Sequence, residues 1–391
     1  MRAKMRRVAV VGAGITKYGK RTDASLKELA FEAVKKSLMD CGLEISDIDA
    51  SVISVANQYL AQQTQPGAII NSYIGMCPKP SFTTVDACGS GSAAIRAAWM
   101  SIASGLHDVV LVVGAEKMTE IDTPQAIEYM GFAGDPLWEL RPTGITDAGL
   151  YAMFANAHME KYGTTQEQLA LVAVKNHKYA AMNPISHLKK EITVEDVMKS
   201  KMVSYPLKLF DCSPISDGAA ALILACEERA KKITEKPVYF LGLGAATDTV
   251  TIFEREDLTG LMATREAAKR AYAMAGIGPS DIDVADVHDC FTIAEIMAYE
   301  DLGFCKKGEG GKFIEEKRSY LEGDKPVNVD GGLKAKGHPL GATGVGMVYE
   351  IVKQLRGEAG PRQVKGAKIG LTHNVSRDGT HVFVQILGVD F

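Results

Sequence analysis

Short runs of β-branched residues alternate along the chain with longer stretches in which apolar residues recur at helical spacing. The short runs predict strands, and the stretches between them, for example 26–40 and 265–274, predict amphipathic helices. This alternation is typical of βαβ units around a buried sheet, so the pattern predicts an α/β fold. The predicted strands begin at Val8, Ala50, Ser81, Asp108, Ala221, Val238, Val284, Lys368 and Val382.

The chain contains an internal repeat. The segment EAVKKSLMDCGLEISDID from Glu32 matches EAAKRAYAMAGIGPSDID from Glu266, at an offset of 234 residues that holds without a gap through the whole segment. A weaker echo aligns ACGSGSAA at 87–94 with GHPLGATG at 337–344. Repetition on this scale predicts two similar structural halves.

The repeat divides the chain into an N-terminal half, residues 1–235, and a C-terminal half, residues 236–391. Within the first half, residues 118–213 have no counterpart in the second, and they are rich in Met, Tyr and His and mostly helical in pattern. We expect this region to be an insertion that forms a cap or a substrate-binding surface.

Composition and charge narrow the class of protein. With 46% apolar and 24% charged residues, the 391-residue chain is typical of a globular protein of two or three domains. The net charge of −4, without a basic stripe, gives no support for a nucleic-acid partner. Apolar runs such as Val109–Val113 are too short to span a membrane. Basic residues including Arg2 and Lys4 precede the first run, but no cleavage pattern follows, so no signal peptide is predicted.

The cysteine pattern and the first glycine-rich turn limit the cofactors. Seven cysteines, an odd number without a CxxC pair, suggest neither a metal site nor a disulfide framework, and reduced thiols favour a cytoplasmic protein. The turn after the first strand resembles a dinucleotide loop, but Lys17 stands where the third glycine is needed. We therefore predict no NAD, no other cofactor and no metal.

Three segments place reactive side chains where a predicted strand gives way to a predicted helix. Cys88 stands in the Gly-rich segment VDACGSGSAAI at the N-terminus of a helix, where the helix dipole favours a thiolate. His288 and Cys290 lie in VHDCF, and His338 lies in GHPLGATG ahead of another helix. If the halves pack as the repeat suggests, Cys88 and His338 occupy equivalent loops and face each other across the pseudo-symmetry axis. We interpret Cys88 as a nucleophile; a buried structural cysteine is the alternative.

Together these motifs resemble those of thiolases. VDACGSGSAAI is similar to the nucleophile motif of that family, SDGAAALILA from Ser216 to its SDGAAA strand, and HDCF at 288–291 and GHPLGATG at 337–344 complete the expected order. HDCF, where many thiolases carry an NEAF-type motif, resembles the sterol-carrier-protein-type branch and its archaeal relatives. The resemblance implies duplicated βαβαβαββ halves packed as an α-β-α-β-α five-layer structure, with an inserted loop domain.

One loop departs from the family pattern. Many thiolases have a second catalytic cysteine in a C-terminal CxGG motif, whereas the corresponding loop here reads THNVSRDGTH, with Asn374 at the place of the cysteine. In the branch that carries HDCF, the cysteine of that motif takes the acid/base role, so the resemblance makes Cys290 the candidate. Arg377 and Asp378 replace the expected glycines and alter the loop, and Asn374 could equally be a turn residue.

The resemblance implies an acetyl-CoA C-acetyltransferase, which joins two acetyl-CoA molecules into acetoacetyl-CoA by Claisen condensation, with coenzyme A as substrate and product. His338 activates Cys88, which carries the acyl group as a thioester. Cys290 removes the α-proton of the second acetyl-CoA, and His338 and His288 hold the enolate oxygen. The backbone N–H of Cys88 and one from the 374–379 loop form a second oxyanion hole.

The resemblance to archaeal relatives also implies a role in mevalonate and isoprenoid synthesis. The partners are then 3-hydroxy-3-methylglutaryl-CoA synthase and a small zinc-ribbon/OB-fold protein, and the chain itself forms a homodimer or tetramer. The insertion must contact coenzyme A, and its polar residues His158, Asn176, His177 and Asn183 are candidates that the sequence does not separate from structural residues.

Other functions fit parts of the same pattern. A degradative 3-ketoacyl-CoA thiolase uses the same groups in reverse. A thiolase-like aldol lyase with an OB-fold partner tends to lack the nucleophilic cysteine, so Cys88 argues against it. A ketoacyl synthase acting on acyl carrier protein has an HGT-type loop where this chain has GHPLGATG. A non-catalytic scaffold subunit does not require the two cysteines and two histidines, so their presence argues against this function.

Overall fold

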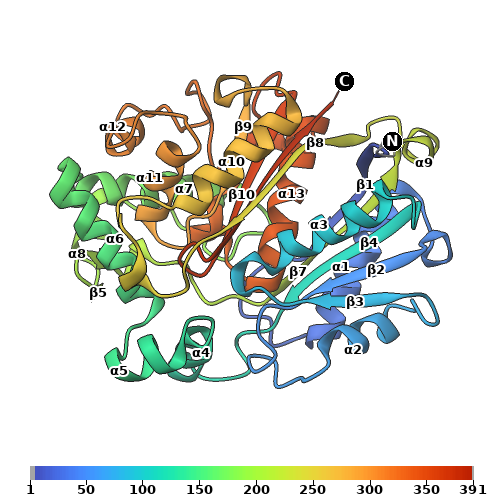
Figure 1. Ribbon diagram of the computed structural model, residues 1–391, viewed down its shortest axis with the longest axis horizontal. Helices are drawn as coiled ribbons and strands as arrows, with labels where there is room; N and C mark the ends of the chain where they lie inside the picture. The colour runs from blue at the N-terminus through green and yellow to red at the C-terminus, as the bar shows by residue number, and fades with distance from the viewer. Residues whose placement is uncertain (1–4, 390–391) are drawn as a thin grey trace.

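One mixed sheet of nine strands runs through the structure, a computed structural model that describes residues 5–389 (Figure 1). Arg2 and Lys4, which entered the signal-peptide argument, lie outside the described residues. No helix within residues 5–389 combines the length and the apolar character that crossing a membrane requires. All nine predicted strands form, as β1 Val8–Ile15, β2 Ala50–Ser54, β3 Ser81–Thr84, β4 Val109–Glu116, β7 Gly218–Cys226, β8 Val238–Thr247, β9 Val284–Val287, β10 Ile369–Ser376 and β11 His381–Gly388.

The strand order is repeated in the two halves of the chain. Across the sheet the order is β3-β2-β4-β7-β1-β8-β11-β10-β9, so each half places its strands in the same sequence outward from the centre. The counterpart of β3 in the second half is reduced to one parallel bridge between Ala285 in β9 and Val327. Strands β1 and β8 pair antiparallel, with Ala9 opposite Tyr239, and this contact joins the halves.

The repeated segments have the same local structure in both halves. Each contains a helix that ends at a left-handed glycine, with φ 70° at Gly42 and 71° at Gly276, a conformation that favours glycine. A 3-10 turn follows, and then Asp49 or Asp283. Each of these carboxylates accepts hydrogen bonds from two successive backbone N–H groups where the neighbouring strand begins. The SDID match in the sequence therefore corresponds to the same hydrogen-bonded turn in both halves.

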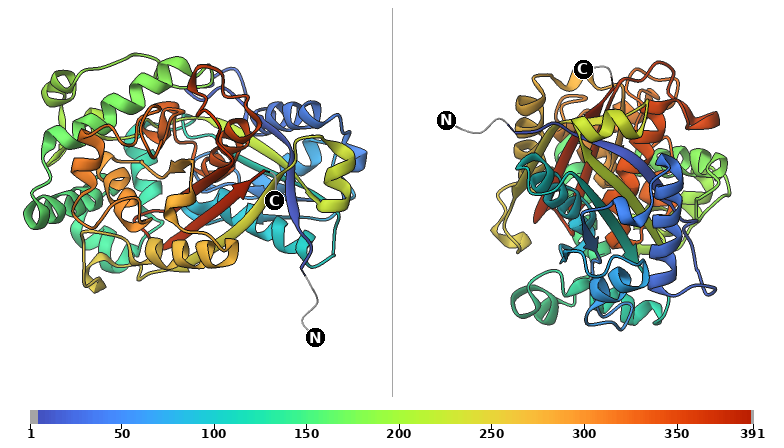
Figure 2. Two further views of the ribbon diagram at one scale, coloured as in Figure 1. Left: turned by 90° about the horizontal axis from the view of Figure 1, so that it is seen from above. Right: turned by 90° about the vertical axis from the view of Figure 1, so that its right-hand side faces the viewer.

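Helices cover and separate the two half-sheets (Figures 1 and 2). Helices α1 and α2 lie on the outer face of the N-terminal half, and α10 lies on the outer face of the C-terminal half. Helix α13 lies between the halves, because it packs against α3, β4 and β7 on one side and against β9 and β10 on the other. This is the layered α-β-α-β-α arrangement that the family resemblance implies. The bounds are α1 Leu26–Cys41, α2 Pro66–Tyr73, α3 Ser90–Ala103, α9 Glu227–Ile233, α10 Met262–Ala275 and α13 Leu340–Arg356.

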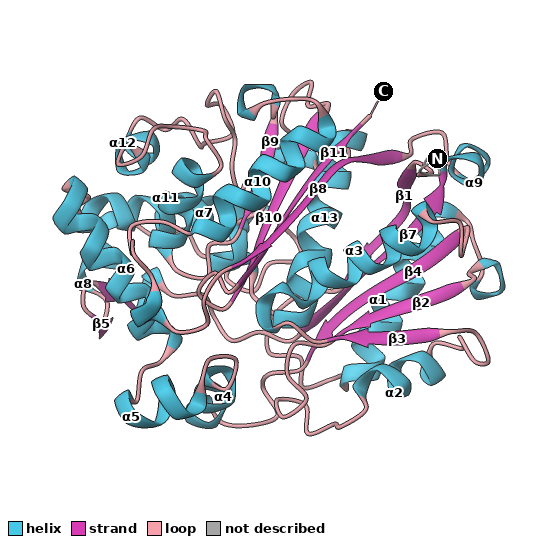
Figure 3. Ribbon diagram, viewed as in Figure 1, coloured by secondary structure: helices cyan, strands magenta, loops and turns pink. Residues whose placement is uncertain are grey.

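The region between β4 and β7 forms a mostly helical unit beside the C-terminal half (Figure 3). Its helices α6 and α7 pack against α11 and α12, and their apolar side chains join the core of that half. The bounds are α4 Thr123–Gly131, α5 Arg141–Thr143, α6 Asp147–Tyr162, α7 Gln166–Met182, α8 Val194–Lys199, α11 Thr292–Asp301 and α12 Gly310–Glu315, with the unpredicted two-stranded ribbon β5 Met202–Ser204 and β6 Leu207–Lys208.

A buried aspartate fixes both ends of this insertion. Asp217, just before β7, accepts hydrogen bonds from the backbone N–H groups of Met118 and Thr119, just after β4, and from the ammonium group of Lys117 at 2.8 Å. The chain therefore leaves and re-enters the sheet at one point, and the long connection leaves the register of β4 and β7 undisturbed.

Candidate active site

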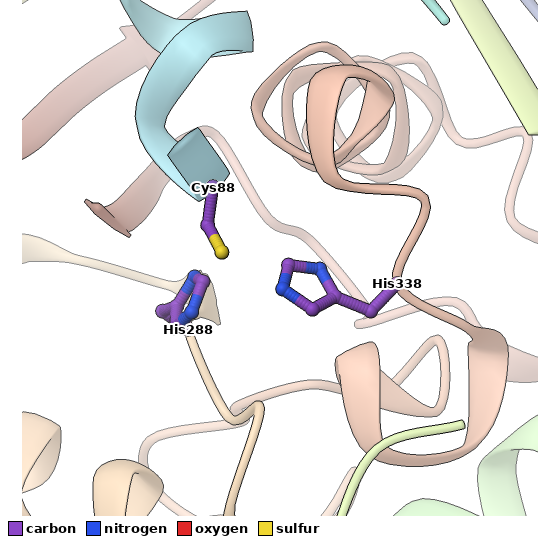
Figure 4. Close-up of side chains that lie close together, drawn as sticks. All are labelled: Cys88, His288 and His338. Carbon is purple, nitrogen blue, oxygen red and sulfur yellow. The ribbon is translucent and has the colours of Figure 1, made fainter. Parts of the chain in front are cut away.

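Three side chains from segments far apart in the sequence converge at one end of the sheet (Figure 4). The sulfur of Cys88 and one ring nitrogen each of His288 and His338 all lie within 4.8 Å of one another. The two imidazole rings meet edge to face, with their centroids 5.2 Å apart. The structure thus brings together three of the four predicted catalytic residues, and the fourth, Cys290, lies two residues beyond His288.

The local fold explains how Cys88 comes to face His338. Cys88 lies in a tight turn, Ala87–Gly89, that leads into α3, and Ala87 has the left-handed φ of 41°. At position 91 a Cβ atom would lie 2.9 Å from the backbone nitrogen of Gly344 in α13, so only glycine allows this approach of the two helices. Cys88 near the start of α3 and His338 just before α13 are therefore neighbours, as the weaker sequence echo suggested.

Hydrogen bonds fix which nitrogen of His338 faces the thiol. Its Nδ1 lies 2.7 Å from the hydroxyl of Thr343, and that hydroxyl donates its own proton to the carbonyl of Pro339. Nδ1 must then carry the proton, which leaves the lone pair on Nε2, and Nε2 has no other hydrogen-bond partner. Burial and the nearby charge of Lys336 lower the pKa of His338 to about 3, so the ring is neutral and can act as a base.

The Cys88 side chain is a thiol at rest. Burial raises its pKa above the usual range, the charge of Asp147 adds to this, and a hydrogen bond from the backbone N–H of Arg377 acts in the opposite direction. Burial therefore outweighs the helix dipole on which the sequence argument relied. A thiol whose pKa is raised in this way needs a base beside it, and the free Nε2 of His338 is in that position.

Asn374 is part of this cluster and not a surface turn residue. It lies in β10, fully buried, and its amide nitrogen donates to the carbonyl of Cys88 at 3.0 Å and lies 3.3 Å from Nδ1 of His288. Because the amide donates to Nδ1, the proton of His288 is on Nε2, which makes that nitrogen a donor. Burial lowers the pKa of His288 well below its usual value, so this donor is a neutral imidazole.

Cys290 lies close to the sulfur of Cys88. It is buried, and its thiol is hydrogen-bonded to the hydroxyl of Tyr151, whose ring stacks on Phe291 with centroids 4.6 Å apart. Burial raises the pKa of Cys290 well above its usual value, and the nearby sulfur of Cys88 raises it further. Cys290 therefore holds its proton at rest and becomes a strong base once it has lost it.

A cavity of about 580 Å³ opens onto Cys88. Its walls come from both halves and from the insertion, so the nucleophile lies where all three parts of the chain meet. Residues that line it include Asn57, Tyr59, Val85, Met130, Phe132, Asp147, Val250, Leu340, Arg377 and His381.

The connections that Arg377 makes were not predicted from the sequence. This residue has a left-handed φ of 50°, its guanidinium binds the carboxylate of Glu139 at 2.8 Å, and its Nε lies 3.8 Å from the carboxylate of Asp147. Its carbonyl accepts a hydrogen bond from Tyr151 at 2.7 Å. Burial raises the pKa of Asp147 to about 6. The departure from CxGG was the sequence signal for this region, but nothing local in the sequence pairs Arg377 with Glu139.

The four polar residues of the insertion that were candidates for coenzyme A contact do not line the cavity. His158, Asn176, His177 and Asn183 are buried, and each has a partner inside the protein. Asn176, for example, donates to Asp289 and Glu295 beneath the HDCF loop. Their polar side chains therefore support the packing of the insertion on the C-terminal half.

Two family models and several known proteins match this chain along nearly its whole length. A model described as "Thiolase, N-terminal domain" matches residues 8–228, and one described as "Thiolase C-terminal domain-like" matches residues 244–389. The chain belongs to the thiolase family. It is 46% identical to an acetyl-CoA acetyltransferase of Methanothermobacter thermautotrophicus, covering 98% of this chain and 99% of the relative. It is 39% identical to sterol carrier protein 2 of Bos taurus, covering 96% of this chain and 71% of that protein.

Solved structures show the same fold. The structure titled "Ltp2-ChsH2(DUF35) aldolase" superimposes with a TM-score of 0.87 at 29% identity over 99% of both chains. The acetyl-CoA acetyltransferase of Syntrophomonas wolfei gives 0.74 at 20% identity over 99% of this thiolase and 100% of that chain. The family models and the relative at 46% identity, and not these structures, show that this member of the family is an acyltransferase enzyme with thiolase function.

Proposed function

We propose that this thiolase is an acetyl-CoA C-acetyltransferase that condenses two acetyl-CoA molecules into acetoacetyl-CoA. The observation that carries the proposal is that Nε2 of His338, which has no hydrogen-bond partner, lies beside the sulfur of Cys88, onto which a cavity opens. The relative named acetyl-CoA acetyltransferase, similar over nearly the whole chain, supports the choice of substrate.

The first half-reaction acylates Cys88. His338 takes the thiol proton through Nε2 as the sulfur attacks the carbonyl carbon of acetyl-CoA. The developing oxyanion accepts hydrogen bonds from backbone N–H groups of Cys88 and of the loop at Arg377. When the C–S bond to coenzyme A breaks, Cys290 gives its proton to the leaving sulfur. The products are acetyl-Cys88, free coenzyme A and a Cys290 thiolate.

The second half-reaction forms the carbon–carbon bond. The Cys290 thiolate removes an α-proton from the second acetyl-CoA, which its raised pKa favours. The enolate oxygen accepts hydrogen bonds from Nε2–H of His288 and from the protonated His338. The enolate carbon attacks the acetyl-Cys88 carbonyl, the thioester bond to Cys88 breaks, and His338 returns its proton to the sulfur.

Acetylation of the intact protein tests this assignment. After mixing with acetyl-CoA, we expect the mass of the protein to rise by one acetyl group, and the Cys88→Ala variant to show no rise. Cys290→Ala keeps a thiol at 88 and should still acquire the acetyl group, more slowly because solvent must then protonate the departing coenzyme A, but it should form no acetoacetyl-CoA. An acetylated Cys88→Ala protein would refute the nucleophile assignment.

A thiolase-like aldol lyase is the second candidate, because the structural relative with the TM-score of 0.87 is titled an aldolase paired with a DUF35 protein. A lyase of this kind cleaves a carbon–carbon bond without an acyl-enzyme. Acetylation of Cys88 together with acetoacetyl-CoA formation favours the transferase, whereas retro-aldol cleavage that survives Cys88→Ala favours the lyase.

We also propose the wider context that the resemblance implies. A small zinc-ribbon/OB-fold protein and 3-hydroxy-3-methylglutaryl-CoA synthase are the proposed partners, in mevalonate synthesis in the cytoplasm, and the seven free cysteines are consistent with a reducing compartment. Homo-oligomerisation is supported by the edge strand β3, which leaves Phe82 about half exposed. Co-purification with these partners and sedimentation of wild type against Phe82→Asp test the two proposals separately.

A further inference from the structure

The cluster of Cys88, His288 and His338 has the donor set of a soft-metal site. Thiolate and imidazole are the ligands that Zn²⁺ prefers in proteins. Within residues 5–389 these three form the one group of histidine, cysteine or carboxylate side chains whose donor atoms lie this close together. Figure 4 shows the thiol and both rings directed at a common point.

The distances leave room for an ion after small side-chain movements. Three atoms within 4.8 Å of one another have a common point no farther than about 2.8 Å from each, which is 4.8 Å divided by √3. Zinc binds sulfur at about 2.3 Å and imidazole nitrogen at about 2.0–2.1 Å. Inward shifts of about 0.5–0.8 Å therefore complete three bonds, and rotation of the Cys88 side chain and of both rings supplies them.

The surroundings prepare His338 as a ligand. Its Nδ1–H is held by the Thr343 hydroxyl, which orients the ring and leaves Nε2 free, as in metal sites whose histidines donate their other N–H to an oxygen. Nε2 of His288 is likewise buried without a hydrogen-bond partner.

We propose that Zn²⁺ binds reversibly to Cys88, His288 and His338 and that it inhibits the enzyme by occupying its nucleophile. The Cys88 thiol loses its proton to solvent as the Zn–S bond forms. His288 binds through Nε2 as a neutral imidazole once its proton has moved to Nδ1, and the Asn374 amide turns so that Oδ1, which has no hydrogen-bond partner at rest, accepts that proton. One proton is thus released for each ion bound. The fourth position faces the cavity and takes water, so acyl-CoA and zinc compete for the same sulfur.

Metal binding is measured directly, so the test of the zinc site does not depend on the proposed reaction. Apoprotein is titrated with Zn²⁺ against a chromophoric chelator, and with Co²⁺ as a spectroscopic substitute. We expect one ion per chain, release of one proton, and a thiolate-to-cobalt charge-transfer band. Cys88→Ala should abolish the band and weaken zinc binding at least 100-fold, and Thr343→Val should weaken it about tenfold because the ring of His338 loses its orientation.

Two other cysteine variants serve as matched controls. Cys77 is exposed, and Cys77→Ala should leave zinc affinity and the cobalt spectrum unchanged. Cys290 lies outside the three-atom cluster, so Cys290→Ala should also retain the metal. Equal zinc affinity in wild type and Cys88→Ala would overturn the proposal, as would a cobalt band that disappears in Cys77→Ala.

The inhibitory part of the inference rests on the proposed function and has its own readout. Zinc should block acetylation of wild type in the mass assay, a chelator should restore it, and prior acetylation of Cys88 should prevent binding of the metal. Zinc binding in a protein that acetyl-CoA does not acetylate would contradict the proposed function and leave the site standing. Normal acetylation at saturating zinc would overturn the inhibition.

Discussion

The connection between β4 and β7 and the connection between β10 and β11 occupy equivalent places in the two halves, yet they have opposite characters. The first spans residues 117–217 and carries helices α4–α8, whereas the second is a turn at 377–380. The long connection contributes Met130, Phe132 and Asp147 to the lining of the cavity, and the short one places the backbone N–H of Arg377 beside the nucleophile. A duplicated framework can therefore keep its register while each connection specialises.

The two connections meet at Arg377. Its backbone belongs to the short turn beside Cys88, and its guanidinium is bound to Glu139 in the long connection. The starts of the two equivalent helices also differ. The turn that leads into α3 holds Cys88, whereas α13 follows His338. The N-terminal half thus supplies the nucleophile and the C-terminal half supplies the base. A substitution in one half should therefore change the activity of the groups in the other.

Removing the base from the C-terminal half should have the largest effect. His338→Ala should slow acetylation of Cys88 by about 10²–10⁴-fold at pH 7, the range that general-base catalysis contributes. Because the pKa of His338 is about 3, the wild-type rate should change little between pH 5 and 8. In the variant the rate should rise with pH through the alkaline range, because the pKa of Cys88 is raised and only hydroxide remains to take its proton.

Rates of acetylation measured by mass spectrometry across this pH range check the prediction. Cys88→Ala is the control, and it should show no acetylation at any pH. A His338→Ala protein with the wild-type pH profile would mean that another group activates the thiol.

Removing the ion pair of Arg377 with Glu139, which joins the two connections, should have an intermediate effect on activity. Arg377→Gly restores a glycine that tolerates the left-handed φ, so the turn can keep its shape, but the ion pair with Glu139 is lost. We expect kcat/KM for acetyl-CoA to fall about 10–100-fold, as the backbone donor beside Cys88 is held less firmly. The loss of the buried guanidinium also enlarges the cavity, so longer acyl-CoA substrates should lose less than acetyl-CoA does.

A chain-length series of acyl-CoA substrates measures this shift, with Glu139→Gln as the matched variant. That substitution keeps the volume and removes the charge, so it should lower kcat/KM without favouring longer chains. If Arg377→Gly lowers kcat/KM by the same factor for every chain length, the turn does not determine which acyl-CoA substrate is preferred.

Much of the fold could be predicted from the sequence, because it depends on local patterns. The nine strands follow runs of β-branched residues, and the SDID repeat identifies equivalent turns at Asp49 and Asp283. Convergence of Cys88 with His338 was expected from the repeat alone. The ion pair of Arg377 with Glu139 could not be predicted, because it joins two connections whose paths the strand pattern does not determine. The burial of Asn176 could not be predicted either, since a polar residue on a helix is usually exposed.

Substitution of the two equivalent aspartates should have the smallest effect, and it tests whether the duplicated halves contribute equally to stability. Each carboxylate accepts two backbone N–H groups at the start of the neighbouring strand, Asp49 for β4 and Asp283 for β10. Asn retains one acceptor oxygen but loses the charge, so Asp49→Asn and Asp283→Asn should each lower the free energy of unfolding by about 1–2 kcal/mol. Chemical denaturation of both variants measures it, with Asp47→Asn, which also caps a turn but joins no strand, as the control. Equal losses in the two halves mean that the framework has remained symmetric in its energetics while its connections diverged; a loss confined to one half would place the stability of the fold on that side alone.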